Sequence, residues 1–193
     1  DMLTQATQAV YKKNVELAIR NKILSVLRTI YDITMSSVDI SESSQRIVDS
    51  VVKELSMPLA LIFLNENQNE DQKARLRLVS VNQSAKLEQS FVLIQKFVSD
   101  VNIEREYTEN LLNQSLIKKE KQVTGNMLDI LMPFLTQKDA DILESELKVK
   151  TFISYPLYFG GRELGVFVVG IGKTAEDLSR AENMTLDELI SVI

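Results

Sequence analysis

Apolar residues in the first 38 positions recur at steps of three and four, which is the spacing of one face of a helix. This row consists of Val15, Ile19, Ile23, Val26, Ile30 and Ile33. A second row, with steps of seven, consists of Val10, Leu17, Leu24 and Tyr31, and Asn14 and Asn21 lie between its members. No glycine or proline lies between Leu3 and Val38, so the pattern predicts one long helix. Two apolar rows imply two partners, the rest of the chain and a second helix.

The second row has two interpretations. Asn14 and Asn21 occupy intermediate positions of a heptad seam, where a buried asparagine specifies register and pairing at a cost in stability. In that case a parallel homodimer has a seam made of Val10, Asn14, Leu17, Asn21, Leu24 and Tyr31. In the other interpretation both asparagines are exposed and the helix only caps the chain's own globular part.

The next segment predicts a helix followed by a buried strand. Asp39, with Glu42 three residues later, resembles a capping box and starts a helix over Ser41–Leu55. Pro58 ends this helix, and the aliphatic run Leu59–Leu64 has the continuous apolar character of a buried strand.

A polar loop and an alternating strand come next. Asn65–Lys73 contains only polar residues and is expected to connect a hairpin. Ala74–Asn82 alternates and predicts the second strand. Leu76 and Leu78 should lie on one side of it, and the other side should carry Arg75, Arg77, Val79 and Val81.

The middle of the chain is expected to contain two short helices, two short strands and one small apolar segment. These are the helices Phe91–Val98 and Thr108–Lys118, the strands Val101–Ile103 and Lys119–Asn126, and the segment Met127–Leu135.

The last part of the chain predicts a helix, a hairpin and a further helix. Asp139 lies three residues after the expected N-cap Thr136, which starts a helix ending at Leu147. The predicted hairpin joins the strands Lys150–Phe159 and Glu163–Ile171 through a glycine-containing turn.

Ser179, with Glu182 three residues later, then starts the final helix. The order of elements predicts an α+β fold with an antiparallel sheet, in which the first and last helices lie together. The chain opens on Asp1 and closes on an apolar helical pattern without a cap, so it is expected to be a fragment of a longer polypeptide.

Composition removes most familiar chemistries. The chain contains no cysteine, and therefore no thiol nucleophile or iron–sulfur ligand, and no histidine, the usual general base and haem ligand. We therefore expect no enzymatic activity from this chain, and no metal site. Its 22 Lys and Arg against 27 Asp and Glu give a net charge of −5, which argues against a nucleic-acid partner. The longest apolar runs span about eight residues, against ~20 needed to cross a bilayer, so no membrane contact is expected.

The final hairpin, Ile153–Val166, resembles the closing hairpin of a GAF domain. It consists of an apolar strand with Ser-x-Pro-Leu, a glycine turn, and Leu-Gly-Val opening a second apolar strand. The likeness extends to the flanking helices and covers roughly residues 40–193. Residues 1–38 resemble the coiled signalling linkers that precede GAF domains in bacterial sensor kinases.

This resemblance implies a five- or six-stranded antiparallel sheet. The N- and C-terminal helices should cover one face, and a mixed helix and loop pocket the other. It implies a signalling helix over 1–38 and a GAF-like domain over 39–193. Bilin-binding and methionine-sulfoxide-reducing relatives use cysteine, and haem relatives use histidine or other side chains that this chain lacks, so no haem, bilin or iron–sulfur cofactor is expected, although an unknown small-molecule ligand is possible.

Family members hold ligands between the sheet and the middle helices, and six residues are candidates for that lining. They are Phe63, Arg77, Asn126, Phe134, Ser154 and Tyr155. Each also has a structural interpretation. The two phenylalanines can be plain core, Arg77 can face solvent, Asn126 can belong to a turn, and Ser154 and Tyr155 lie on opposite faces of one strand.

The resemblance predicts a regulatory sensor and dimerisation module of a cytoplasmic bacterial signalling protein, in particular a two-component sensor histidine kinase. Parallel N- and C-terminal helices would transmit the signal. The alternative is a ligand-free structural dimerisation domain of a transcriptional regulator, cyclase or phosphodiesterase.

Overall fold

The computed structural model describes residues 2–36, 39–66, 74–82 and 101–190. Its centre is a six-stranded sheet with the order β3-β2-β1-β6-β5-β4, in which every neighbouring pair is antiparallel. The strands are β1 (Leu59–Glu66), β2 (Arg75–Val81), β3 (Asn102–Glu104), β4 (Gln122–Thr124), β5 (Thr151–Phe159) and β6 (Arg162–Ile171). The antiparallel sheet predicted from the sequence is confirmed, with its four main strands side by side.

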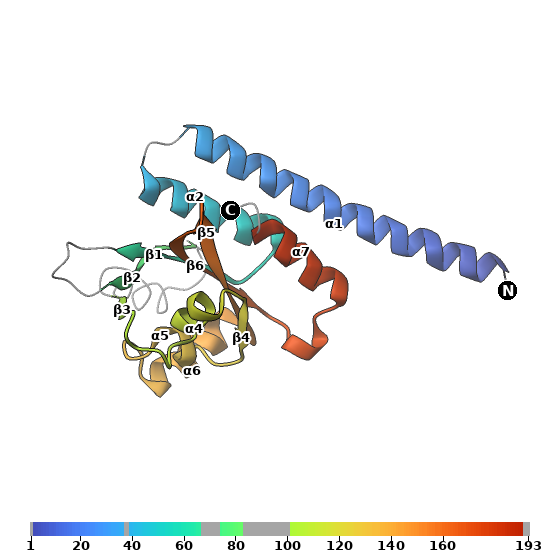
Figure 1. The fold of residues 1–193 in the computed structure, drawn as a ribbon. Coiled ribbons are helices and arrows are strands. Elements are labelled where there is room, and N and C mark those ends of the chain that lie inside the picture. The colour runs from blue at the N-terminus through green and yellow to red at the C-terminus, as the bar shows by residue number, and fades with distance from the viewer. Residues whose placement is uncertain (1, 37–38, 67–73, 83–100, 191–193) are drawn as a thin grey trace.

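Helices cover both faces of the sheet (Figure 1). One face, called here the bundle face, carries α1 (Met2–Ser36), α2 (Ile40–Leu55) and α7 (Arg180–Ile190). The other, called the pocket face, carries α4 (Leu111–Lys118), α5 (Leu128–Leu131) and α6 (Gln137–Leu147). A short 3₁₀ turn, η1 (Ala175–Asp177), lies between β6 and α7. The N- and C-terminal helices share one face, as predicted.

Short polar side chains cap the N-termini of α2, α6 and α7 at the residues predicted from the sequence. The Asp39 carboxylate accepts a hydrogen bond from the Ser41 backbone N–H at 2.8 Å and caps α2. Thr136 and Asp139 form the predicted reciprocal capping box of α6. The Glu182 backbone N–H donates to the Ser179 hydroxyl at 3.2 Å and the Glu182 carboxylate accepts from the Ser179 N–H at 2.9 Å, so α7 has the same box. Each box satisfies backbone donors that the first helical turn leaves free.

The β5–β6 hairpin turns through two glycines. Phe159 pairs with Arg162, and between them Gly160 and Gly161 have φ angles of 56° and 80°. Positive φ at both central positions is the type I′ geometry, whose twist matches that of the strands and which glycine adopts without steric cost.

Two stretches of the sheet differ from the sequence predictions. Asn65 was expected in a loop, but β1 continues to Glu66 because both residues pair with β2. Val81 was expected to lie opposite Leu76 and Leu78, and this prediction is wrong. A bulge makes Val79 an extra residue in β2 and inverts the alternation after it, so Val81 joins the same buried cluster as the two leucines.

One middle helix and one middle strand are shorter than predicted, whereas the strand predicted over Val101–Ile103 keeps its length and is shifted by one residue, to Asn102–Glu104. The helix expected from Thr108 begins at Leu111, because the Asn110 side chain accepts a hydrogen bond from the Leu112 N–H and caps the helix there. The strand expected over Lys119–Asn126 is confined to Gln122–Thr124. The predicted helix Phe91–Val98 lies outside the described residues.

Candidate functional site

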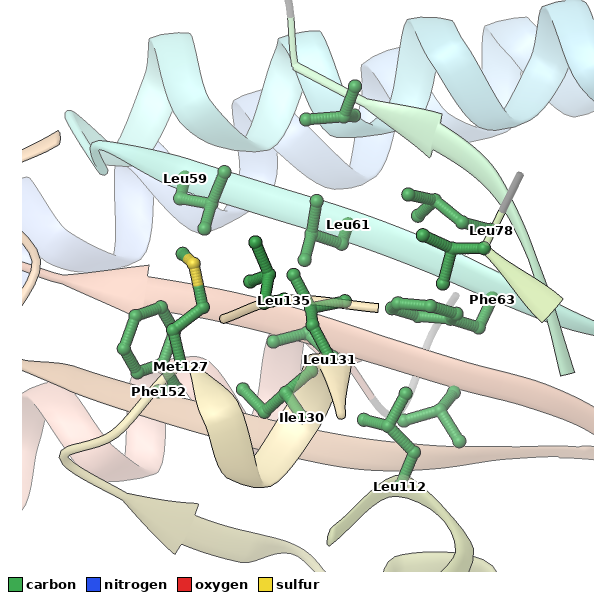
Figure 2. Packing of buried hydrophobic residues seen from close by; sticks show 14 of the residues in the cluster. Leu59, Leu61, Phe63, Leu78, Leu112, Met127, Ile130, Leu131, Leu135 and Phe152 are labelled. Atoms are coloured by element: carbon green, nitrogen blue, oxygen red, sulfur yellow. The ribbon is translucent and has the colours of Figure 1, made fainter. Parts of the chain in front are cut away.

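Buried apolar side chains of the described residues pack together on the pocket face of the sheet. Phe63, Phe152, Leu112 and Ile130 are fully buried there, and Figure 2 shows the side chains of β1, α4 and α5 converging between the sheet and the helices. One cavity on this face that the described residues line has a volume of about 30 Å³. It is lined by Leu59, Leu61, Leu78, Val81, Met127, Leu131, Leu143 and Leu147. All eight are apolar, and a space of this size is about that of one water molecule.

The six pocket candidates do not line one site. Phe63 is buried in the pocket-face core and Phe134 packs against it. Ser154 pairs with Val168 on the same face; its side chain is fully buried, and its hydroxyl has no hydrogen-bond partner among the described residues. A buried hydroxyl without a partner is uncommon, because it costs free energy.

The other three candidates have separate structural roles. Arg77 is exposed, and its guanidinium lies 3.4 Å from the Glu66 carboxylate. The Asn126 side-chain oxygen accepts a hydrogen bond from the Leu128 N–H at 2.9 Å, which is a turn contact at the start of α5. Tyr155 packs in the bundle-face core.

Tyr155 takes part in a polar contact that sequence reasoning missed. Its hydroxyl donates to the Asp187 carboxylate of α7 at 3.0 Å. Lys121, just before β4, lies 2.6 Å and 2.8 Å from the two oxygens of that carboxylate, and 5.9 Å from the centre of the Tyr155 ring. Burial, followed by the charge of Asp187 and its hydrogen bond, raises the pKa of Tyr155 well above the ordinary tyrosine value, so the hydroxyl stays a donor.

This cluster of Lys121, Tyr155 and Asp187, called here the edge latch, ties the β4–β5 edge of the sheet to α7. A second missed contact lies on the other side of the molecule, where the Arg105 guanidinium lies 2.7 Å from the Glu163 carboxylate and donates to the Asn113 side chain at 3.1 Å. Tyr155 and Asp187 are 32 residues apart in the chain, and Lys121 and Asp187 are 66 apart. Arg105 and Glu163 are 58 residues apart, so no local spacing links these pairs.

The second apolar row of α1 faces solvent. Val10, Leu17 and Leu24 are 60%, 53% and 63% exposed, and Asn14 and Asn21 between them are exposed as well. Val26, from the first row, is completely buried against the domain. The Tyr31 side chain lies outside the described set. Val15, also of the first row, is 42% exposed, so among the described side chains of that row only Val26 shows the predicted packing on the domain. The described members of the second row have no partner among the residues that the structure describes.

The first half of α1 extends beyond the rest of the molecule, and α7 lies along its second half, running in about the same direction (Figure 1). Every described side chain from Thr4 to Ala18 is exposed. None of the described helices has the length and apolar character needed to cross a membrane, and within the described residues no group of three carboxylate, imidazole or thiol side chains could hold a metal ion.

Comparison with solved structures finds GAF domains with a similar fold. The GAF domain of an Acinetobacter phosphoenolpyruvate-protein phosphotransferase matches with a TM-score of 0.59 and 20% identity over 88% of both chains. The A. aeolicus nlh2 GAF domain in an inactive state matches with a TM-score of 0.62 and 15% identity over 91% of this chain and 93% of that one. A phycocyanobilin-bound GAF domain from a cyanobacterial phytochrome matches with a TM-score of 0.57 and 13% identity, over 88% and 90%. The chain therefore has the fold of a GAF domain.

No protein-family model and no curated protein matches the sequence. At identities of 20% or less, the likeness to the solved structures shows the fold alone.

Proposed function

We propose that this chain is a regulatory module of a signalling protein and that two copies associate in parallel through α1. The observation that carries this is the exposed row of Val10, Leu17 and Leu24 on α1, a helix whose first half extends beyond the rest of the molecule (Figure 1). Large apolar side chains at seven-residue steps lose contact with water when a second helix covers them.

A parallel arrangement suits this row better than an antiparallel one. In a parallel pair each asparagine meets its counterpart, so Asn14 faces Asn14 and Asn21 faces Asn21, and their amides hydrogen-bond across the seam. An antiparallel pair would place each asparagine against an apolar residue or leave it without a partner.

The same geometry offers a route for a signal. α7 packs beside α1, and the edge latch connects α7 to the strands β4 and β5. A change of packing on the sheet would shift the relative populations of two arrangements of α1 and α7, and the differential stability of those arrangements is the energy available for signalling.

For the parent protein we propose a cytoplasmic bacterial sensor histidine kinase of a two-component system, supported by the resemblance of α1 to the linkers that precede GAF domains in such kinases. A transcriptional regulator, cyclase or phosphodiesterase in which this domain serves only for dimerisation is the alternative. Any catalytic or DNA-binding domain encoded beyond residue 193 distinguishes these parents.

Sedimentation equilibrium over a range of concentrations tests the dimer. Two to three heptads make a weak seam, so we expect a monomer–dimer equilibrium in the micromolar range. The double variant Leu17→Asp with Leu24→Asp should be monomeric, because a charge on a covered seam is costly. At concentrations low enough for the unmodified chain to be monomeric too, the circular dichroism and thermal unfolding of the two chains should match, because both side chains are exposed in a single copy.

The control adds the same charge on another side of the helix, with Gln5→Asp and Ala9→Asp. These exposed positions lie about 100° or more around the helix from the nearest seam residues, Val10 and Asn14, so this variant should retain the dimer. A monomer at the highest concentration of the unmodified chain, or dissociation of both double variants to the same extent, would show that the row is not the seam.

A further inference from the structure

A groove of about 670 Å³ lies at the end of the sheet where β1 begins and β6 ends. Its walls come from α1, the end of α2, the end of α6, the segment after β6, and α7. This end groove is distinct from the small cavity on the pocket face, and its volume is within the range of about 300–1,000 Å³ that is typical of small-molecule sites.

The floor of the end groove is aliphatic. It is formed by Leu55, Met57, Leu147, Ile171, Leu178 and Leu186. Leu186, Leu147 and Ile171 are almost completely buried, at 3%, 6% and 9% exposure, so they form a fixed surface. None of the described lining residues is aromatic. A flexible hydrocarbon chain fits this surface better than a planar ring, which would have no ring to stack on.

The rim of the end groove is positively charged. Lys22 comes from α1, Lys148 follows the last turn of α6, and Lys173 follows β6. Lys173 lies 2.7 Å from the Glu182 carboxylate, whereas Lys22 and Lys148 have no ion-pair partner among the described residues. Three ammonium groups against one carboxylate leave an excess of two positive charges, in a chain whose net charge is −5.

We propose that the end groove binds an aliphatic monocarboxylate, with its hydrocarbon chain on the leucine floor and its carboxylate held by Lys22 and Lys148. The floor supplies affinity through burial of methylene groups. The two lysines supply orientation, because they attract the charged end to the rim.

A ligand in this position would contact α1 and α7 together. Lys22 belongs to α1, and Leu186 and Glu182 belong to α7, so binding would favour the arrangement in which both helices are docked on the domain. The site lies within one copy of the chain and does not depend on the proposed dimer. The monomeric variant Leu17→Asp with Leu24→Asp should bind the same ligand with unchanged affinity.

Isothermal titration calorimetry with decanoate, below its critical micelle concentration, tests this site. We expect decanoate to bind at least a hundredfold more tightly than butyrate, because six more methylene groups are buried. Decyltrimethylammonium, which has the same chain length and the opposite charge, should bind at least tenfold more weakly than decanoate.

Two variants distinguish the contribution of the lysines to binding from that of the apolar floor. Lys22→Gln with Lys148→Gln should weaken decanoate binding about tenfold, whereas Lys118→Gln with Lys138→Gln, which removes two exposed lysines away from the groove, should leave it unchanged. Leu178→Trp, which fills the floor, should abolish binding without changing the charge. If either the Lys22→Gln, Lys148→Gln variant or the Leu178→Trp variant fails to fold, the other still tests the site.

Methyl NMR of the unmodified chain locates the ligand. Decanoate should shift the methyl signals of Leu147, Leu178 and Leu186, and leave those of Leu61 and Leu131 in place. No heat with decanoate, equal binding of the cationic probe, unchanged affinity in the variant lacking Lys22 and Lys148, or shifts centred on Leu61 and Leu131 would each overturn the proposal. If the monomeric variant does not bind decanoate, the site does not lie within one copy of the chain. If the unmodified chain is monomeric and still binds decanoate, the dimer proposal is wrong and the ligand proposal stands.

Discussion

The two faces of the sheet are built differently. On the pocket face, α4, α5 and α6 pack over a core in which described residues line a cavity of about 30 Å³. On the bundle face, long helices that enter and leave the domain cover a second core, and a groove of about 670 Å³ opens beside them. The first face has its partners within the domain, whereas α1 on the second face also presents an apolar row to solvent.

This difference separates the core that stabilises the domain from the helices whose packing can change. A close-packed core resists substitution, because its side chains have no space into which to rearrange. A helix that packs through one face only, such as α1, can open or shift at a lower free energy than the global unfolding of the domain. We therefore expect substitutions on the pocket face to change global stability, and substitutions on the bundle face to change the docking of α1 and α7.

The largest effect is expected for Phe63→Ala. Phe63 is completely buried in the pocket-face core, and removing its ring leaves a cavity among side chains that cannot close it. The free energy of unfolding should fall by about 3–5 kcal/mol, measured by urea denaturation. Phe159→Ala is the control, because Phe159 is 77% exposed and should change stability by less than about 0.5 kcal/mol. Similar effects of the two substitutions would contradict a tightly packed pocket face.

A smaller loss of unfolding free energy is expected for Gly165→Ala. Gly165 lies where β6 pairs with β1, in the middle of the sheet. A Cβ at Gly165 would lie 1.9 Å from the Phe63 carbonyl oxygen, so the strands would have to separate. We expect a loss of about 2–3 kcal/mol in the same urea assay. Gly161→Ala is the matched control in the same hairpin. It has no neighbour within 4 Å and should lose only the ~1 kcal/mol that its positive φ costs a side chain. An equal loss at both glycines would show that β1 and β6 can move apart freely.

Local patterns in the sequence were sufficient for most of the fold. The aliphatic run of β1, the glycine turn after Phe159, and the capping pairs Thr136–Asp139 and Ser179–Glu182 each depend on residues close in the chain. Such signals predict where an element begins and which face it buries. Val81 is one exception, because the bulge that inverts its face depends on how β2 pairs with β1.

The site candidates were harder to predict, because they depend on contacts between distant segments. The alternation along β5 separated Ser154 from Tyr155, but nothing local indicated that the Tyr155 hydroxyl would meet Asp187, 32 residues away. The end groove combines five segments, and only the fold brings Lys22 and Lys148 to the same groove. The exposed row on α1 is the opposite case, since a seven-residue spacing within one helix is visible in the sequence.

A moderate loss of stability, with faster hydrogen exchange mainly in α7, is expected for Tyr155→Phe. The substitution removes the hydroxyl that donates to Asp187 and keeps the buried ring. Because Asp187 is 47% exposed, we expect a loss of only about 1 kcal/mol. Hydrogen exchange of the α7 amides should accelerate more than that of β1. Tyr158→Phe is the matched control, since its hydroxyl donates to the Leu116 carbonyl on the pocket face and its loss should leave α7 exchange unchanged. Acceleration of α7 exchange in both variants would show that the edge latch has no specific role.

The smallest effect is expected for Glu182→Gln, at the start of α7, and it should depend on pH. The hydrogen bond from Lys173 lowers the pKa of Glu182, assisted by the bonds from Ser179 and opposed by partial burial. A carboxylate whose pKa is lower in the folded state stabilises the fold above its unfolded pKa, near 4.3. That stabilisation is lost as the pH falls through the lowered folded value.

The difference in unfolding free energy between the unmodified chain and the Glu182→Gln variant should therefore be at most about 1 kcal/mol at pH 7, because the ion pair is largely exposed. It should shrink as the pH is lowered from 5 to 3 in urea titrations. Ser179→Ala in the same assay separates the capping bond from the ion pair, since it removes the hydroxyl and keeps Lys173 beside Glu182. A difference that stays constant between pH 7 and pH 3 would mean that the charge of Glu182 does not hold the start of α7, and that the wall of the end groove formed by this turn depends on side-chain shape alone.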